Sequence, residues 1–276
     1  MSQWIQTMNT TATPGIGCWI ASYPNPVWDS VPCSNASVGP LTVGNGVDDS
    51  ANSINYAATS AEGLFTSETG FSSESDSVQG ANWYSIQVNT NHYSITFNGH
   101  STTAWEQFAF LNEGGSSNAG YGLVEFWLIG YYLSVGSCPS GWTRYVNNCY
   151  LNSNTVTTPY EGPGSLTSYS LTGSTSSTTD TAKFCNSSAG KCYSTTDSDR
   201  LSLYSGNWWD TEFNILGFGS SSKANFNAGT SIGLETDNFE PGESCGSVAY
   251  SGETNNLSLG TCTGSSTLQY ITFSES

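Results

Sequence analysis

Short runs of alternating apolar and polar residues recur along this chain, whereas the periodicity of amphipathic helices is nearly absent. Such runs occur at residues 82–89, 93–97, 104–111, 123–132, 165–171, 200–204, 212–218, 231–236 and 268–273. Gly, Asn and Ser separate them at hairpin-like spacing, and the stretch N-E-G-G-S-S-N-A-G (112–120) is typical of a hairpin loop. The pattern predicts an all-β protein, an antiparallel β-sandwich of jelly-roll-like type.

The first part of the chain has a different pattern. Pro- and Ser-rich segments surround a short helix that we expect at 53–65, and S-S-E-S-D-S (72–77) is typical of a solvated loop. We therefore interpret residues 1–75 as an irregular N-terminal lead packed on the sandwich, and residues 76–276 as the sandwich domain.

The composition is poor in charge and strongly acidic. Charged residues make up 10% of the 276 residues, against about 25% in typical soluble proteins. The 5 Lys and Arg against 22 Asp and Glu give a net charge of -17, which repels phosphate backbones and anionic lipids. We expect neither a nucleic-acid nor a membrane partner, and no apolar run approaches the roughly 20 residues of a membrane span. Because so few carboxylates can form salt bridges, we also expect the fold to tolerate acid.

Eight cysteines fall into sequence-local couples: Cys18 with Cys33, Cys138 with Cys149, Cys185 with Cys192, and Cys245 with Cys262. Eight cysteines allow about 105 pairings, and proximity favours this neighbour scheme. Disulfides indicate an oxidising compartment, so we expect a secreted, extracellular protein and a monomer. The start M-S-Q-W-I-Q lacks signal-peptide features and is interpreted as a mature form with an added Met. Sequons that permit glycosylation, at a frequency expected by chance, occur at Asn9, Asn35, Asn186 and Asn256.

Several common catalytic arrangements are poorly supported. The only imidazoles are His92 and His100, and the G-T-S-I-G motif around Ser231 has neither a later His nor a following helix, so it is interpreted as part of a strand. One acidic group could bind calcium, although a solvated loop is favoured: Glu235, Asp237, Glu240 and Glu243. We expect no metal ion and no cofactor.

Carboxylates and amides within strand-like runs remain as candidates. Such residues are Glu106 and Gln107 in A-W-E-Q-F, Glu125 in L-V-E-F-W, Glu212 after the W-W pair, and Glu253 in S-G-E-T-N-N. A carboxyl group on an aromatic face is partly desolvated, which raises its pKa and suits it to acid–base chemistry in mild acid. Each could instead point outward or hydrogen-bond a loop.

Two segments, 104–150 and 252–256, resemble the neprosin-like glutamic peptidases. The similarity consists of A-W-E-Q-F-A-F-L, V-E-F-W-L-I-G-Y-Y, a local Cys couple in C-P-S-G-W-T-R-Y-V-N-N-C-Y, and the late G-E-T-N-N. The resemblance implies that Glu253 is one catalytic acid. The first family glutamate falls where this chain has Thr102, and Glu106 would share that strand face. The related eqolisin-type peptidases pair a glutamine with a glutamate, which favours Gln107 with Glu253. The chain also resembles secreted microbial proteins of no established activity.

The first functional hypothesis is therefore an acid-active endopeptidase that cleaves polypeptides. Glu253 would deprotonate the attacking water, and Gln107 or Glu106 would hold that water and donate a hydrogen bond to the oxyanion. Substrate would be bound by Trp105, Trp127 and Asn256.

The second hypothesis is a glycan-binding module or adhesin of the same fold. Trp142, Trp208 and Trp209 would stack on sugar rings, unless they are core residues. An inert, acid-stable surface protein is a third alternative.

Overall fold

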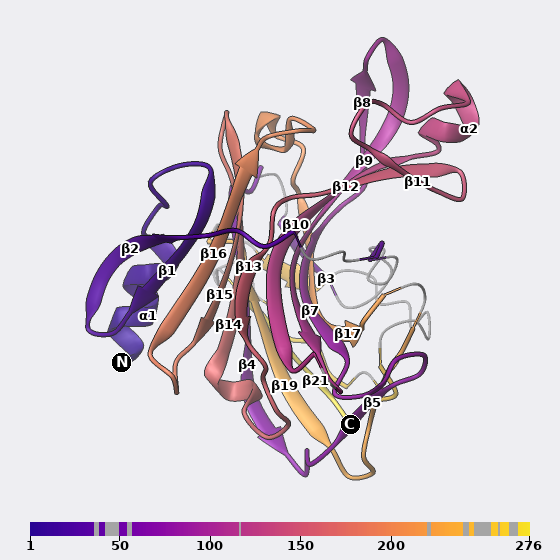
Figure 1. Cartoon of the computed structure of the whole chain (residues 1–276). Coiled ribbons are helices and arrows are strands. Elements are labelled where there is room, and N and C mark those ends of the chain that lie inside the picture. Colours follow the sequence, from indigo (N-terminus) through magenta and orange to yellow (C-terminus); the bar gives the residue numbers. More distant parts are fainter. Residues whose placement is uncertain are drawn as a thin grey trace.

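The computed structural model describes residues 1–35, 39–41, 50–53, 57–115, 117–219, 222–239, 243–245, 255–258, 260–264 and 270–276. Across these residues, two large antiparallel sheets lie face to face, which confirms the predicted all-β sandwich (Figure 1).

The first sheet contains eight described strands. In spatial order they are β2 (Asn25–Val31), β1 (Gly17–Ser22), β16 (Lys191–Ser198), β15 (Thr179–Asn186), β14 (Tyr169–Thr175), β4 (Ser60–Thr69), β19 (Ser231–Asp237) and β21 (Tyr270–Glu275). Three of these strands, β1, β2 and β4, come from the first 75 residues, and β4 lies between β14 and β19. The N-terminal region thus supplies strands to the sandwich itself.

The second sheet contains ten described strands. Eight follow in the order β11 (Thr143–Tyr145), β12 (Asn148–Asn152), β10 (Ala119–Ile129), β9 (His100–Glu113), β7 (Tyr84–Thr90), β17 (Asp210–Gly217), β3 (Ser50–Ser53) and β20 (Glu243–Cys245). Strand β13 (Val156–Pro159) also pairs with β10, and β8 (Tyr93–Phe97) with β9. The N-terminal end of β9, together with β8, β11 and β12, extends beyond the first sheet (Figure 1).

Short elements complete the described structure. A small sheet contains β18 (Ala224–Phe226), β5 (Glu74–Asp76) and β6 (Gly80–Ala81). The helices are α1 (Ser2–Thr10) and α2 (Tyr131–Val135), with 3-10 turns η1 (Leu166–Ser168) and η2 (Leu203–Ser205). None of the helices described could span a membrane.

Most predicted strands are present, but three local predictions are wrong. Residues 60–65 of the expected helix belong to β4, because their backbone pairs with β14 on one side and with β19 on the other. The run at 200–204 ends in η2 instead of forming a strand. The expected solvated loop at 72–77 contains β5, in which Glu74 and Asp76 are buried.

The core between the sheets is aromatic and closely packed. Phe110 of β9 stacks on Phe184 of β15, with ring centroids 3.9 Å apart. Glycines of the first sheet accommodate other rings: a Cβ on Gly173 would lie 2.3 Å from Phe108, and one on Gly63 would lie 1.9 Å from Phe213. These contacts set the close approach of the two sheets.

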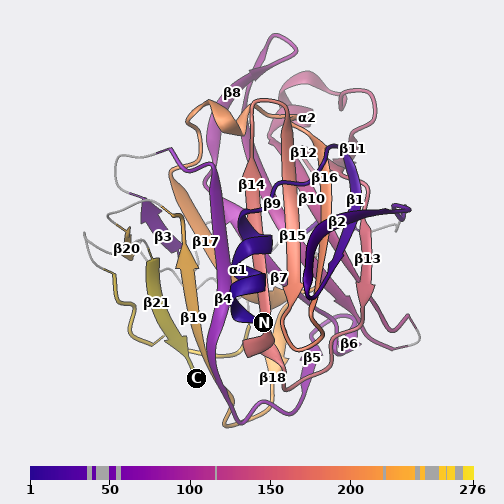
Figure 2. The ribbon, with the colours of Figure 1, turned by 90° about the vertical axis from the view of Figure 1, so that its left-hand side faces the viewer.

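Helix α1 covers the outer surface of the first sheet, over β4, β14 and β15 (Figure 2). Lys183 of β15 is buried beneath it, and its Nζ donates hydrogen bonds to the carbonyl oxygens of Met8, Asn9 and Thr11 at 2.7, 2.8 and 3.2 Å. A cation at the C-terminal carbonyls of a helix is favourable, so Lys183 fixes α1 on the sheet.

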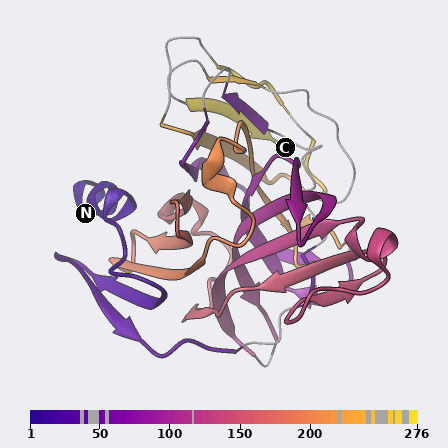
Figure 3. The same ribbon diagram turned by 90° about the horizontal axis from the view of Figure 1, so that it is seen from above.

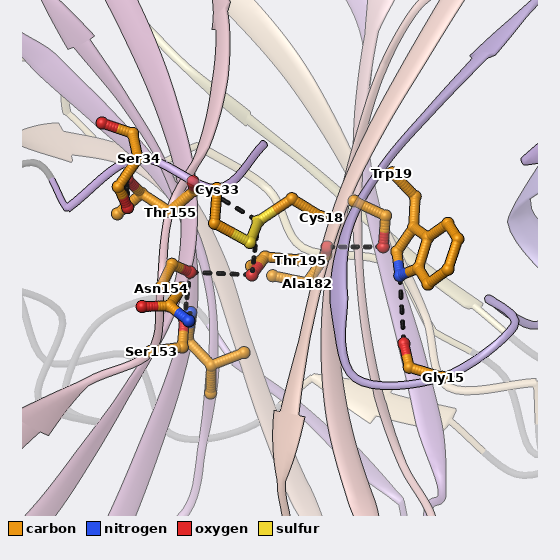
Figure 4. Close-up of a disulfide and its surroundings, with 12 residues drawn as sticks. Gly15, Cys18, Trp19, Cys33, Ser34, Ser153, Asn154, Thr155, Ala182 and Thr195 are labelled. Atoms are coloured by element: carbon orange, nitrogen blue, oxygen red, sulfur yellow. Dashed lines mark hydrogen bonds between the residues drawn. A yellow bond between two sulfur atoms is a disulfide. The ribbon is translucent and has the colours of Figure 1, made fainter. Parts of the chain in front are cut away.

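All four predicted disulfides are present, and no cysteine is free. The Cys18–Cys33 bridge lies beside Thr155, at the end of the first sheet (Figure 4). The next residue, Ser34, exchanges backbone hydrogen bonds of 2.8 and 3.0 Å with Thr155. Ser34 thus connects the N-terminal region to the segment that leads into β13 of the second sheet, and Figure 3 shows the two sheets from above.

Candidate functional site

Strand β9 directs the two adjacent site candidates to opposite faces of the second sheet. Glu106 lies on the same face as Phe108 and points into the space between the sheets, whereas Gln107 lies on the outer face with Trp105. Both side chains are fully buried. Glu106 and Gln107 therefore cannot act on the same substrate atom, and they belong to two separate polar sites.

A row of carboxyl and amide groups crosses four neighbouring strands on the outer face. Gln107 of β9 is paired with Glu125 of β10 on one side and with Asn89 of β7 on the other. Asn89 is in turn paired with Glu212 of β17. Directly paired residues share a face, so Glu125, Gln107, Asn89 and Glu212 form one row, hereafter the outer-face row. All four are at most 2% exposed.

Two hydrogen bonds fix the amide of Gln107. The Trp127 indole N–H donates to Gln107 Oε1 at 2.8 Å, and Gln107 Nε2 donates to Gln87 Oε1 at 2.8 Å. The chain continues from Gln87 Nε2 to Ser85 Oγ at 2.8 Å, and from Ser85 to the Gly217 carbonyl at 2.7 Å. This network fixes the orientation of the Gln107 amide, because its oxygen faces a donor and its nitrogen faces an acceptor.

Glu125, opposite Gln107, is an unusually basic carboxyl group. Burial raises its pKa to about 8. Hydrogen bonds from the Leu41 backbone and from Trp127 and Asn152 favour the ionised form and lower the pKa, but burial has the larger effect. At acidic and neutral pH this group is therefore protonated and available as a proton donor. At the other end of the row, Asn89 Nδ2 donates to Glu212 Oε2 at 2.9 Å.

A segment of the N-terminal region covers this face. Leu41 donates its backbone N–H to Glu125 Oε1 at 2.8 Å, and its side chain is buried in an apolar cluster with Ala109, Leu111 and Leu123. The described conformation of the outer-face row is therefore closed to solvent.

The two tryptophans expected to bind substrate, Trp105 and Trp127, lie on the same outer face. Trp105 and Trp127 are neighbours, with ring centroids 6.1 Å apart, and both are buried. The Trp105 indole N–H donates to the Thr90 carbonyl at 3.0 Å. In this conformation the rings pack beside the row instead of lining an open groove.

The predicted acid Glu253 lies outside the described residues, so its separation from Gln107 or Glu106 stays a prediction. Its neighbour Asn256 is described. Asn256 Nδ2 donates to the Phe226 carbonyl at 2.9 Å, and its Oδ1 accepts from the Phe226 N–H at 2.7 Å. These bonds attach the segment 255–258 to β18.

The inner face of β9 carries a second polar site, between the sheets. Tyr93 Oη donates to Glu106 Oε1 at 2.8 Å, and the carboxylates of Asp180 and Asp199 lie close to Glu106. Burial and the Asp180 and Asp199 charges raise the pKa of Glu106. The local sequence pattern carries no signal for Asp180 or Asp199, because they meet Glu106 only through the packing of one sheet on the other.

The aromatic residues of the glycan hypothesis are divided by the fold. Trp208 is fully buried and stacks on Phe108, with centroids 5.4 Å apart, so it is a core residue. Trp142 packs edge-on against Phe97 at 5.6 Å. Trp209, at 50% exposure, is the one of the three that is largely accessible.

Neither a family model, a curated protein nor a solved structure matches this chain. The fold defines it as a disulfide-bonded, all-β sandwich with a buried carboxyl–amide row on one outer face.

Proposed function

We propose that this protein is a secreted, acid-active endopeptidase of the glutamic type, with its catalytic groups on the outer face of the second sheet. The observation that supports this proposal most is the pairing of Gln107 with Glu125, an oriented amide directly opposite a buried carboxyl group. The four disulfides support an oxidising, extracellular location.

The chemistry assigns different roles to the three groups. Glu253 is the base that removes a proton from the attacking water, as the resemblance to glutamic peptidases implies. The Gln107 amide donates a hydrogen bond to the oxyanion that forms on the scissile carbonyl. Glu125, which is protonated in acid because its pKa is about 8, donates a proton to the departing amine. This division of roles would support cleavage at acidic pH without a bound metal ion.

The contact of Leu41 with Glu125 supports a polypeptide substrate. A backbone N–H donates to this carboxyl group while the attached leucine side chain occupies the apolar cluster of Ala109, Leu111 and Leu123. A substrate peptide would use the same two features, a hydrogen-bonded backbone and an apolar side chain. Its binding requires displacement of residues 39–41.

The experiment is cleavage of a fluorescently labelled, unfolded polypeptide between about pH 3 and pH 6, the range in which a carboxylate base near pKa 4.3 becomes ionised. We expect Glu253→Gln, Gln107→Ala and Glu125→Gln each to reduce kcat by at least about 100-fold. Glu74→Gln is the matched control, because Glu74 is a buried carboxyl group on the small sheet, away from the row.

Glu106→Gln distinguishes the two faces of β9. If Glu106→Gln abolishes cleavage while Gln107→Ala does not, the assignment to the outer face is wrong. Folding of each variant is checked by its melting temperature. Binding of glycans with no cleavage at any pH would instead support the lectin-like alternative, with exposed Trp209 as the first residue to substitute.

A further inference from the structure

Three carboxylates meet at one end of the sandwich, between the two sheets. Glu106 comes from β9 of the second sheet, Asp180 from β15 of the first, and Asp199 from the segment that follows β16. One oxygen of each lies within 4.8 Å of the other two. Glu106 and Asp180 are fully buried, and Asp199 is partly exposed. The cluster is therefore an interior site that reaches the surface at Asp199.

Hydrogen bonds satisfy only half of the buried oxygens. Glu106 Oε1 accepts from Tyr93, and Asp180 Oδ1 accepts from Thr175 Oγ1 at 2.6 Å. Glu106 Oε2 and Asp180 Oδ2 are buried without any hydrogen-bond donor in the described structure. A buried carboxylate oxygen without a partner is costly, and two of them at one site indicate that something else binds there.

Protein cations do not neutralise this cluster. The charged side chains that act on Glu106 and Asp180 are Asp180, Asp197 and Asp199, all of which are acidic. The nearest basic residue in the sequence, Arg200, directs its guanidinium to Asp197 at 2.9 Å and is exposed, while its backbone N–H contacts Asp180. Three adjacent carboxylates without a cation repel one another strongly inside a protein.

We propose that Glu106, Asp180 and Asp199 bind a calcium ion that joins the two sheets at this end of the sandwich. Calcium accepts carboxylate and carbonyl oxygens in flexible numbers, whereas magnesium demands a near-ideal octahedron. Zinc and copper prefer nitrogen or sulfur ligands, which this oxygen cluster does not provide. The carbonyl oxygen of Leu201, 3.4 Å from the Tyr93 hydroxyl that donates to Glu106, is a further candidate ligand. The ion would enter past the partly exposed Asp199.

The ion connects the two sheets of the sandwich. Glu106 and Asp180 lie on strands of different sheets, and the segment of Asp199 leads into η2 and then Trp208. Binding one cation to all three raises the stability of the whole sandwich, because the site exists only in the folded chain.

Thermal unfolding of the full chain near pH 8 tests the proposal, because protons compete with a cation for carboxylate ligands at lower pH. After treatment with EDTA, added millimolar Ca²⁺ raises Tm by roughly 5 to 10 °C, and equal Mg²⁺ raises it by much less. Terbium provides a second readout. Tb³⁺ bound beside Tyr93 gives sensitised luminescence, which Ca²⁺ suppresses by competition.

Substitution of single ligands locates the ion. Asp199→Asn, which changes a partly exposed residue, is expected to lower Ca²⁺ affinity at least about 10-fold, and Glu106→Gln to remove the Tm response. Glu74→Gln, with a buried carboxyl group elsewhere, retains the full response. The proposal is overturned if Ca²⁺ changes neither Tm nor the Tb³⁺ luminescence of the unsubstituted protein. It is equally overturned if Asp199→Asn and Glu106→Gln respond like the unsubstituted protein.

Discussion

The backbone N–H of Leu41 donates a 2.8 Å hydrogen bond to the carboxyl group of Glu125, so a peptide group of the N-terminal region lies on the candidate proton donor. Glu125 belongs to the outer-face row, and Leu41 packs on the apolar residues beside it. The same contact stabilises the fold and closes the site. Release of this contact is therefore expected to change stability and activity in opposite directions.

Leu41→Gly tests this opposition. Loss of the buried leucine is expected to destabilise the protein by about 3 kcal/mol, because a large apolar side chain leaves the cluster. At acidic pH the cleavage rate per folded molecule is expected to rise several-fold, because the row becomes accessible. Leu133→Gly is the control, since Leu133 is 72% exposed. A Leu41 variant that is destabilised but no more active would show that residues 39–41 do not limit access.

Stability is expected to fall as pH rises, in contrast to proteins whose carboxylates are salt-bridged. Burial raises the pKa of Glu125 to about 8, of Glu62 to about 7 and of Glu74 to about 9. The folded chain therefore holds more protons than the unfolded chain between about pH 4 and pH 9. Between about pH 4 and its own raised pKa, each of these groups lowers the free energy of unfolding by up to about 1.4 kcal/mol per pH unit.

Melting temperatures at pH 4 and pH 8 provide the measurement, on protein that is first stripped of calcium with EDTA at pH 8 and then exchanged into calcium-free buffers. We expect the higher Tm at pH 4, with a smaller difference between the two pH values for Glu125→Gln. A single ion pair, Arg200–Asp197, is present among the described residues, so acid breaks few favourable contacts. A lower Tm at pH 4 than at pH 8 would contradict the predicted acid tolerance.

Gly173→Ala is expected to destabilise the sandwich by about 3 kcal/mol, because the new methyl group would lie 2.3 Å from the Phe108 ring and separate the sheets. Chemical denaturation gives the free energy of unfolding. Gly15→Ala is the matched control, because no atom lies within 4 Å of the place that its new methyl group would take. Equal stability of the two variants would show that the contact at Gly173 relaxes at little cost.

Lys183→Met is expected to loosen helix α1 while leaving the sandwich folded. The substitution retains an apolar chain of similar length but removes three hydrogen bonds to carbonyls near the end of the helix. Hydrogen exchange resolves the effect: amides of α1 exchange faster, whereas those of β9 and β10 keep their protection. Unchanged exchange in α1 would mean that Trp4 and Met8 hold the helix without Lys183.

The sequence predicted the strands well and the sites only in part. The alternation along β9 predicts that Glu106 and Gln107 lie on opposite faces of the sheet. The hairpin at 112–120 is consistent with the observed pairing of Gln107 with Glu125, because these two residues lie equally far from the midpoint of the hairpin loop. The contributions of Asn89 and Glu212 depend on pairing between distant segments, for which the local pattern carries no signal.

The wrong predictions have a common physical cause. Glu74 and Asp76 were expected in a solvated loop, yet Asp76 accepts backbone hydrogen bonds from Val78, Gln79 and Phe218, which make a buried carboxylate acceptable. Trp208 was a candidate for sugar stacking, yet its ring lies on Phe108 in the core. In each case tertiary contacts, which a single sequence does not display, decided the environment.

The four disulfides join cysteines only 7 to 17 positions apart, and none connects remote regions of the chain. A newly made polypeptide that emerges gradually into an oxidising environment therefore meets each correct thiol partner before the next couple appears. In a chain delivered in this order, vectorial synthesis favours the native set among about 105 arrangements, so we expect little dependence of maturation on an isomerase.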